Sequence, residues 1–270
     1  MALHATYFGA NGWLLEFGSL RVLLDPWLTG TLEFPPGPWL FQGRLAQPWP
    51  VPQRLDLLLL SQGLPDHSHP ASLELLEKSL PVVGSAAAAQ RVQALGFSSV
   101  TALTPGQHHD FAGLRITATA GAPVPQVENG YLLEHAEGRL YVEPHGFLAP
   151  DLPAQPLDAV ITPVVDLGLP LAGAFVKGRQ VLPRLLERFE PLTVLASTAG
   201  GEADYTGLLT KLLWQEGTAA AAAALLTTPP LDRPSLPSDL PGASRFIDPV
   251  PGVRYSLAAK PTCLVAKAPE

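Results

Sequence analysis

The chain has 270 residues, of which 47% are hydrophobic and 15% charged, so it can bury a large core. A formal net charge of −7, with no run of basic residues, argues against binding to the phosphate backbone of a nucleic acid. One cysteine, Cys263, excludes an intramolecular disulfide and a cysteine-based zinc site. The apolar runs are too short to span a membrane and the N-terminus lacks a signal-peptide pattern, so we expect a soluble, cytoplasmic protein.

The N-terminal segment is predicted to be a meander of three strands. Its apolar stretches cover residues 5–8, 13–17 and 20–24, and Asn11-Gly12 and Gly18-Ser19 between them favour tight turns. The third strand leads into Asp25-Pro26-Trp27.

A long loop over residues 34–53 follows the meander. It is rich in proline and aromatic residues, and the prolines argue against regular structure. Two roles stay open for it: a lid over a site, or a cover packed by its own aromatic side chains.

A mixed α/β region comes next. Residues 55–60 are a continuous apolar run, typical of a strand buried on both faces, and they lead into a polar turn over 61–69. Pro70 suits the first turn of a helix whose apolar face would hold Leu73, Leu75, Leu76 and Leu80. We then expect a strand over 81–84, a helix over 85–95 that Ser85 begins, and a strand over 99–103. This alternation indicates parallel neighbouring strands.

The rest of the chain repeats this mixture without a flexible linker, so we predict one domain over residues 1–270. The expected strands cover 114–119, 130–134, 139–143, 158–163, 192–197, 253–257 and 262–266, and the last would bury Cys263. The expected helices cover 181–189 and 205–214. We interpret His108-His109-Asp110 as a solvated turn and residues 227–243 as a proline-rich surface loop.

The turn over residues 61–69 carries the side chains best suited to chemistry. It follows the carboxyl end of a buried strand, where open α/β sheets place their ligands. Asp66, His67 and His69 supply one carboxylate and two imidazoles, which zinc, iron and manganese accept. A second interpretation is structural, with Asp66 or Ser68 accepting backbone N–H bonds at the start of the following helix.

This turn resembles the metal motif of metallo-β-lactamase-fold hydrolases. In that family His-x-His-x-Asp-His ends a buried strand, after two meander strands and an Asp-Pro. Asp25-Pro26-Trp27 resembles the corresponding segment in the branch that contains ascorbate-6-phosphate lactonase. The sequence of residues 61–69 resembles that of uncharacterised cyanobacterial and plastid relatives. The resemblance covers Tyr7 to about Gly201. It implies an α/β fold, namely a four-layer αββα sandwich, with divalent metal at the edge of the two sheets.

The motif itself departs from the family pattern. Asp66 and His67 match its last two ligands, whereas Gln62 and Leu64 replace its first two histidines. Leucine cannot bind a metal, and a neutral amide is a poorer zinc donor than imidazole. The resemblance therefore implies that the first of the two usual metal sites is empty.

The ligands further along the chain differ as well. Glu143-Pro144-His145 stands where the family has a metal-bridging aspartate. No histidine lies between residues 110 and 134 to serve as the middle ligand, and Ser197 stands where the last histidine often is. One site could still be rebuilt from Asp66, His67, His69 and His145, if the loop curls enough for residues 67 and 69 to converge.

We therefore expect one divalent ion, zinc or else iron or manganese, in a hydrolase-like protein. Water held by the ion and oriented or deprotonated by Asp66 would attack an ester, a lactone or a phosphodiester. The 34–53 loop would cover an amphipathic small-molecule substrate. The alternatives are a metal-free active site in the same cleft, or a catalytically inactive member that binds a small ligand or a protein there, because fold alone does not decide function.

Overall fold

The predicted N-terminal meander forms three strands of a seven-stranded sheet in the computed structural model, which describes residues 3–123, 127–197, 203–227 and 244–257. The strand order is β20-β1-β2-β3-β6-β7-β8, and β3, β6, β7 and β8 run parallel. The strands are β1 (Leu3–Gly9), β2 (Gly12–Phe17), β3 (Leu20–Leu24), β6 (Leu57–Leu60), β7 (Val82–Gly84), β8 (Val100–Ala102) and β20 (Arg254–Leu257). Since β3 and β6 pair in parallel, their carboxyl ends bring residues 25 and 61 to the same edge of the sheet.

The second half of the chain forms another seven-stranded sheet, in the order β19-β16-β13-β12-β11-β10-β9. Its strands are β9 (His108–Phe111), β10 (Leu114–Pro123), β11 (Val127–His135), β12 (Gly138–Val142), β13 (Ala159–Pro163), β16 (Thr193–Ser197) and β19 (Arg245–Ile247). Strands β12, β13, β16 and β19 pair in parallel. The parallel strands of each sheet thus lie at one side of it, and its antiparallel strands lie at the other.

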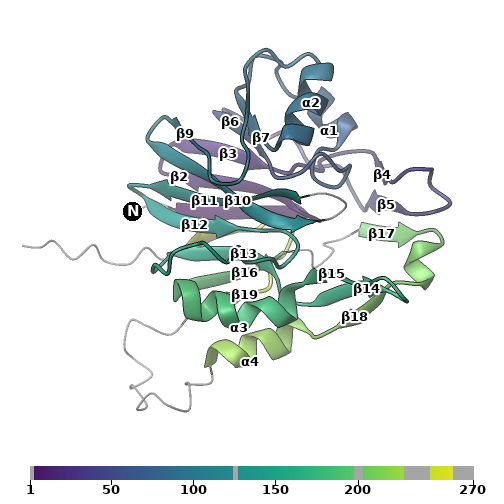
Figure 1. The fold of residues 1–270 in the computed structure, drawn as a ribbon. Helices are drawn as coiled ribbons and strands as arrows, with labels where there is room; N and C mark the ends of the chain where they lie inside the picture. Colours follow the sequence, from purple (N-terminus) through teal and green to yellow (C-terminus); the bar gives the residue numbers. More distant parts are fainter. Residues whose placement is uncertain (1–2, 124–126, 198–202, 228–243, 258–270) are drawn as a thin grey trace, which may run out of the picture.

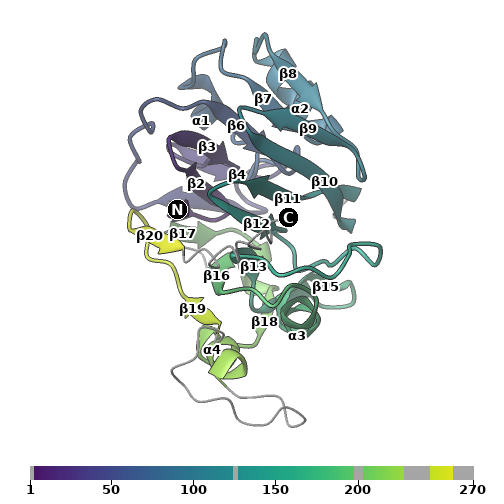
Figure 2. The same cartoon turned by 90° about the vertical axis from the view of Figure 1, so that its left-hand side faces the viewer.

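The two sheets pack face to face, and two helices cover the outer face of each, which confirms the αββα sandwich (Figures 1 and 2). The helices are α1 (Pro70–Glu74), α2 (Ala86–Ala94), α3 (Gly178–Phe189) and α4 (Ala219–Thr227). All four residues of β6 are leucines, because both faces of the strand are buried. Leu57 and Leu59 face the core between the sheets, and Leu58 and Leu60 face α1 and α2. A strand buried on both faces was the prediction for this run.

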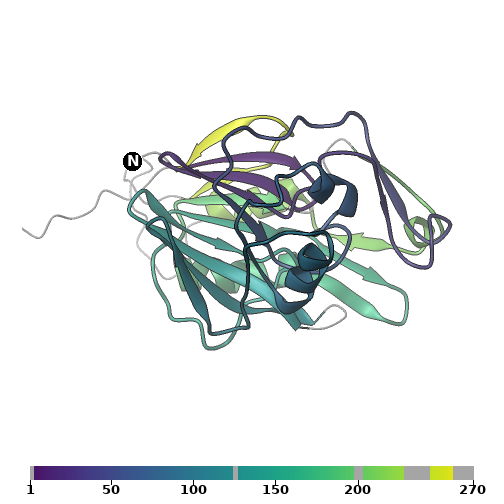
Figure 3. The ribbon, with the colours of Figure 1, turned by 90° about the horizontal axis from the view of Figure 1, so that it is seen from above.

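Two small three-stranded sheets extend from the sandwich. One consists of β4 (Thr31–Glu33), β5 (Gln42–Leu45) and β17 (Ala203–Thr206), and the other of β14 (Asp166–Leu169), β15 (Gly173–Lys177) and β18 (Trp214–Glu216). Seen from above, the β4–β5 hairpin reaches beyond the main sheets and lies beside β17 (Figure 3). The predicted absence of regular structure over 34–53 was therefore wrong, because β5 pairs there with β4 and β17.

The predicted helix over 205–214 was also wrong. The chain instead forms the end of β17, the 3-10 turn η1 (Leu209–Lys211) and the start of β18. Gly207 separates β17 from η1 with a φ of +108°, which no helix adopts, and a Cβ added there would lie 2.7 Å from the Leu40 carbonyl oxygen. Tertiary contact with the 34–45 hairpin thus overrides the local pattern.

Two further predictions need correction. The helix after Pro70 is short, because it ends at Glu74 and leaves Leu75 52% exposed, although Leu73, Leu76 and Leu80 are buried as expected. The predicted turn at 108–110 is part of β9, an edge strand paired with β10. From residue 228 on, the predicted 227–243 loop lies outside the described residues, as does the strand over 262–266 with Cys263. Within the described ranges no helix is long and apolar enough to cross a membrane.

Candidate functional site

The carboxyl ends of β3 and β6 build a buried polar cluster. Asp25 follows β3 with a φ of +42°, and Ser61 follows β6. The Ser61 backbone N–H donates to Asp25 Oδ1 at 2.7 Å, and the Ser61 hydroxyl donates to Asp25 Oδ2. Both side chains are almost fully buried, so the Asp25 carboxylate depends on these bonds and on its third partner, His67.

The 61–69 turn brings His67 onto Asp25. Two backbone bonds to the Leu64 carbonyl, from the N–H groups of His67 and Ser68, close the turn at 3.1 and 2.8 Å. His67 Nδ1 then lies 2.8 Å from Asp25 Oδ2, which directs Nε2 of the ring toward Asp66. A carboxylate that orients an imidazole through one nitrogen and frees the other is the usual support of a metal-binding or catalytic histidine.

Asp66 lies on the other side of the His67 ring. Its Oδ2 is 3.3 Å from His67 Nε2, and its side chain is 21% exposed. Burial alone would lower the pKa of His67, but the charges of Asp66 and Asp25 outweigh it and raise that pKa to about 10. Burial likewise raises the pKa of Asp66, and the charge of His67 outweighs this, so the pKa lies below its usual range. Without an ion, the ring therefore carries a proton between two carboxylates.

Asn11 completes this group and was not predicted as a site residue. Its Nδ2 lies 3.3 Å from Asp66 Oδ2 and 3.2 Å from His67 Nε2. It sits in the β1–β2 turn, where the register of the two strands shifts and both Gly9 and Ala10 have positive φ. Asn11-Gly12 predicts the turn, but nothing in the sequence predicts the direction of the Asn11 side chain.

His145 reaches the same region from the second sheet. It follows β12 in a turn that Glu143 fixes, because Glu143 accepts bonds from the backbone N–H groups of His145 and Phe147. Its Nδ1 lies 2.8 Å from Gln62 Nε2, and its ring centroid is 5.4 Å from that of His67. Burial, followed by the charge of His67, lowers the pKa of His145 to about 4, so this ring is neutral at neutral pH.

The structure does not bring His69 to this group. His69 is the N-cap of α1, and its Nδ1 accepts from the Ser72 backbone N–H at 3.3 Å and lies 2.9 Å from the Ser72 hydroxyl. Its Nε2 lies 3.1 Å from the carbonyl of Thr31. Asp66, His67 and His145 are thus near one another, while both ring nitrogens of His69 have other partners. The N-cap of α1 is therefore His69, and not Asp66 or Ser68 as the structural interpretation of the turn predicted.

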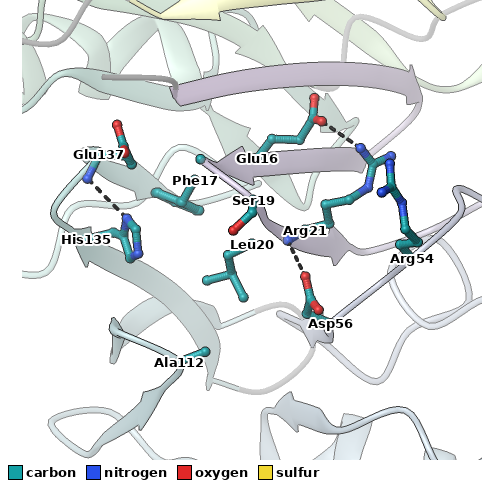
Figure 4. Close-up of a pocket in the computed structure, with 11 residues that line it drawn as sticks. Glu16, Phe17, Ser19, Leu20, Arg21, Arg54, Asp56, Ala112, His135 and Glu137 are labelled. Atoms are coloured by element: carbon teal, nitrogen blue, oxygen red, sulfur yellow. Dashed lines mark hydrogen bonds and ion pairs between the residues drawn. The ribbon is translucent and has the colours of Figure 1, made fainter.

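Two of the hollows in the described part of the chain border the sandwich. One of about 520 Å³ lies against the 61–69 turn and is lined mainly by apolar groups, with charged side chains among them (Phe34, Pro35, Pro36, Pro65 and Pro70, with Glu33 and Arg91). The other, of about 650 Å³, lies at the opposite end of the strands, by the β2–β3 turn (Figure 4). There the Arg21 guanidinium bonds to Glu16 and the Arg21 backbone N–H to Asp56, so its charged groups largely pair with each other. The smaller hollow is the one that the 61–69 turn helps to line, through Pro65 and His69.

Comparisons with known proteins find the same architecture in one protein family and in several solved structures. The model of the beta-lactamase superfamily domain matches residues 4–197. No curated protein matches the chain. Among solved structures, an isothiocyanate hydrolase from Delia radicum gut bacteria is 16% identical, with a TM-score of 0.61 over 95% of this chain and 100% of that one. A metallo hydrolase from the archaeon Ignicoccus hospitalis is 13% identical, with a TM-score of 0.61 over 96% and 100% of the two chains. A possible metal-dependent hydrolase from Veillonella parvula is 17% identical, with a TM-score of 0.57 over 73% and 85%. At these identities the likeness establishes the fold alone.

Proposed function

The chain belongs to the beta-lactamase superfamily, and on that premise we propose that it is a hydrolase that uses one divalent metal ion at the edge where Asp66 and His67 meet. The observation that carries the proposal is the pair of atoms Asp66 Oδ2 and His67 Nε2, 3.3 Å apart, with Nδ1 of the same ring fixed on Asp25. Histidine, cysteine and carboxylate donors are few: within the described ranges, no three His, Cys, Asp or Glu side chains lie close enough together to hold an ion.

The donor chemistry fits one ion and does not fit two. Two atoms that bind one tetrahedral zinc at 2.0–2.1 Å lie about 3.3 Å apart, which is the spacing of Asp66 Oδ2 and His67 Nε2. Asp66 Oδ1 is buried without a hydrogen-bond partner among the described residues, as expected where a positive charge is still to be added. At the family's first site, Gln62 bonds to His145 and leaves no imidazole in place of the missing histidines.

A divalent ion held there would supply Lewis-acid polarisation of the scissile group and would lower the pKa of a water molecule. The chain's own residues prepare the geometry. Asp25 and Ser61 keep the His67 ring in one orientation, and Asp66 is charged at neutral pH. Because a carboxylate with a lowered pKa is a weak base, Asp66 is better suited to orienting the water than to deprotonating it.

The substrate class follows from the hollow beside the turn. Its apolar lining and the single cation of Arg91 suit a small amphipathic molecule that carries an anionic group and an ester, lactone or phosphodiester bond. Residues 31–37 form one wall, which is the covering role proposed for the 34–53 loop.

Elemental analysis tests the proposal on full-length chain purified without chelators and without a metal-binding tag. We expect about one equivalent of zinc, iron or manganese per chain, and hydrolysis of at least one member of an ester, lactone and phosphodiester panel. His67→Ala should lose both, whereas His135→Ala, at the opposite hollow, should keep both. A parent chain that holds no metal and hydrolyses nothing would contradict the proposal.

A second function is favoured by a specific observation. The imidazolium of His67 already lies between Asp25 and Asp66, so the cluster is electrostatically satisfied without an ion. An inactive member that binds a small molecule in the hollow beside the 61–69 turn is consistent with this. Calorimetric binding of small amphipathic carboxylates to metal-free chain, lost in Arg91→Ala, would support this function instead.

A further inference from the structure

We infer that Asn11 is the third protein donor to the ion, through its side-chain amide oxygen. This inference rests on the proposed function, because it concerns the ion that Asp66 and His67 would hold. It replaces His69 and His145 as the completing ligands and adds a residue type that a search for histidines and carboxylates does not consider.

The first argument is the spacing of three atoms. Asn11 Nδ2 lies 3.2 Å from His67 Nε2 and 3.3 Å from Asp66 Oδ2, and those two atoms lie 3.3 Å from each other. The three form a nearly equilateral triangle whose edge equals the ligand–ligand spacing of a tetrahedral ion. A triangle of protein donors leaves one position open, which is the arrangement of catalytic rather than structural zinc sites.

The second argument is the hydrogen bonding of the amide. As oriented, the Asn11 amide donates to Asp66 at 3.3 Å, its Nδ2 also faces the protonated Nε2 of His67 at 3.2 Å, and its Oδ1 is buried without a partner among the described residues. An amide keeps its shape when its oxygen and nitrogen exchange places, so Oδ1 can occupy the vertex of the triangle. There it would add a neutral oxygen to the carboxylate and imidazole, a donor set that zinc, iron and manganese accept.

The third argument is the backbone that aims Asn11 inward. Ala10 has a φ of +47°, a left-handed conformation that costs a residue with a Cβ roughly 1 kcal/mol or more. The Tyr7 hydroxyl holds this turn by donating to the Ala10 carbonyl at 3.0 Å. Non-glycine residues in such conformations gather at functional sites, and this one directly precedes the proposed ligand.

The other candidates for the third ligand, His69 and His145, are placed less favourably than Asn11. Both ring nitrogens of His69 have partners in α1 and β4. His145 Nδ1 lies against Gln62, and its ring centroid is 5.4 Å from that of His67. Neither side chain shares the triangle that Asn11 forms.

The test is titration of chelator-stripped full-length chain with Zn²⁺, in competition with a chromogenic chelator, together with the absorption spectrum of the Co²⁺ form. The parent should bind one equivalent and give the intense spectrum of a tetrahedral Co²⁺ site. Asn11→Leu should bind at least tenfold more weakly and change the Co²⁺ spectrum. Asn11→Asp, which offers a charged oxygen at the same vertex, should bind at least as tightly as the parent.

Each outcome separates this inference from the proposed function. If the parent binds one equivalent and Asn11→Leu has the same affinity and spectrum, the inference is overturned while the proposed function stands. If the parent binds no metal, both fail. The melting temperature of each metal-free variant shows whether it folds, and where Asn11→Leu does not, the Asn11→Asp affinity decides: a loss relative to the parent overturns the inference. His135→Ala controls for binding by an unrelated histidine.

Discussion

Replacement of His69 by alanine should destabilise the fold and leave metal binding intact. The His69 ring makes three contacts: with the Ser72 backbone N–H, with the Ser72 hydroxyl and with the Thr31 carbonyl. At about 1 kcal/mol for each buried hydrogen bond, the expected loss in the free energy of unfolding is about 3 kcal/mol. These bonds determine the tautomer of His69. Because Nδ1 accepts the bond from the Ser72 N–H, Nε2 must carry the hydrogen and donate to the Thr31 carbonyl oxygen.

Urea denaturation followed by circular dichroism measures this loss. His69→Asn keeps a side-chain oxygen for the cap but does not reach Thr31, so we expect it to recover about 1 kcal/mol of the loss. Ser85→Ala removes a single N-cap bond, at the start of α2, and should cost only about 1 kcal/mol. A loss in His69→Ala no larger than that of Ser85→Ala would refute the reasoning. So would a folded His69→Ala chain that no longer binds an ion, because His69 would then be a ligand.

The same residue predicts a dependence on pH. Burial, opposed by the bond to Thr31, lowers the pKa of His69 below its usual 6.5. The unfolded chain therefore takes up a proton near pH 6.5 that the folded chain does not, and stability that is complete above that pH falls as the pH decreases through it. The difference in unfolding free energy between the parent and His69→Asn should thus shrink below pH 6.5. A difference that stays constant from pH 7.5 to 5.5 would contradict this.

Two further substitutions test other parts of the structure. Gly207→Ala should lower the free energy of unfolding by more than about 2 kcal/mol, because φ is +108° and a Cβ would lie 2.7 Å from the Leu40 carbonyl oxygen. The control Gly96→Ala, with positive φ but open space around it, should cost only about 1 kcal/mol. Equal melting temperatures of the two variants would argue against the contact with Leu40. Burial, opposed by three backbone N–H donors, raises the pKa of Glu143 to about 7. Since the folded value lies above the unfolded one, stability present below pH 4.5 is lost as pH rises through 7, by up to about 3 kcal/mol, and Glu143→Gln should lack this loss in pH-dependent denaturation.

The main sheets could be predicted because their signals are local. The β3 strand over 20–24 was predicted to the residue, and Ser85 caps α2 as expected. In each case the apolar period and the turn residues lie within a few positions of each other. The small sheet of β4, β5 and β17 could not be predicted this way, because its pairing joins residues 31–45 to 203–206 across the whole chain.

The helix predicted over 205–214 shows how a local pattern fails. Leu208, Leu209, Leu212 and Leu213 have the spacing of a helical face, yet Leu208 and Leu212 are 47% and 43% exposed. What decides the conformation is the approach of the backbone at Gly207 to Leu40, which no periodicity reveals.

The candidate site also combines residues that a local pattern predicts with residues that only the fold reveals. Asp66 and His67 were predicted from their position at the end of a buried strand, and the structure places them 3.3 Å apart. His69 was considered with them because the ligand types matched, but alternate residues of an extended turn point to opposite sides, and its ring caps the helix. Asp25, quoted only as part of a family signature, is the carboxylate that orients His67.

The losses in the motif and the strain around it have to be considered together. Gln62 and Leu64 remove histidines, which by itself would suit a fold that has lost its site. Yet two residues with a Cβ, Ala10 and Asp25, hold left-handed conformations on either side of the cluster, at a cost of roughly 1 kcal/mol or more each. Other non-glycine residues of the described chain have positive φ away from this edge (Arg54, Ala112, Leu171 and Glu190), so the strain alone does not mark a site. What distinguishes Ala10 and Asp25 is their position, because Ala10 precedes Asn11 and Asp25 supplies the carboxylate behind His67, and both conformations therefore serve the group that we propose to bind the ion.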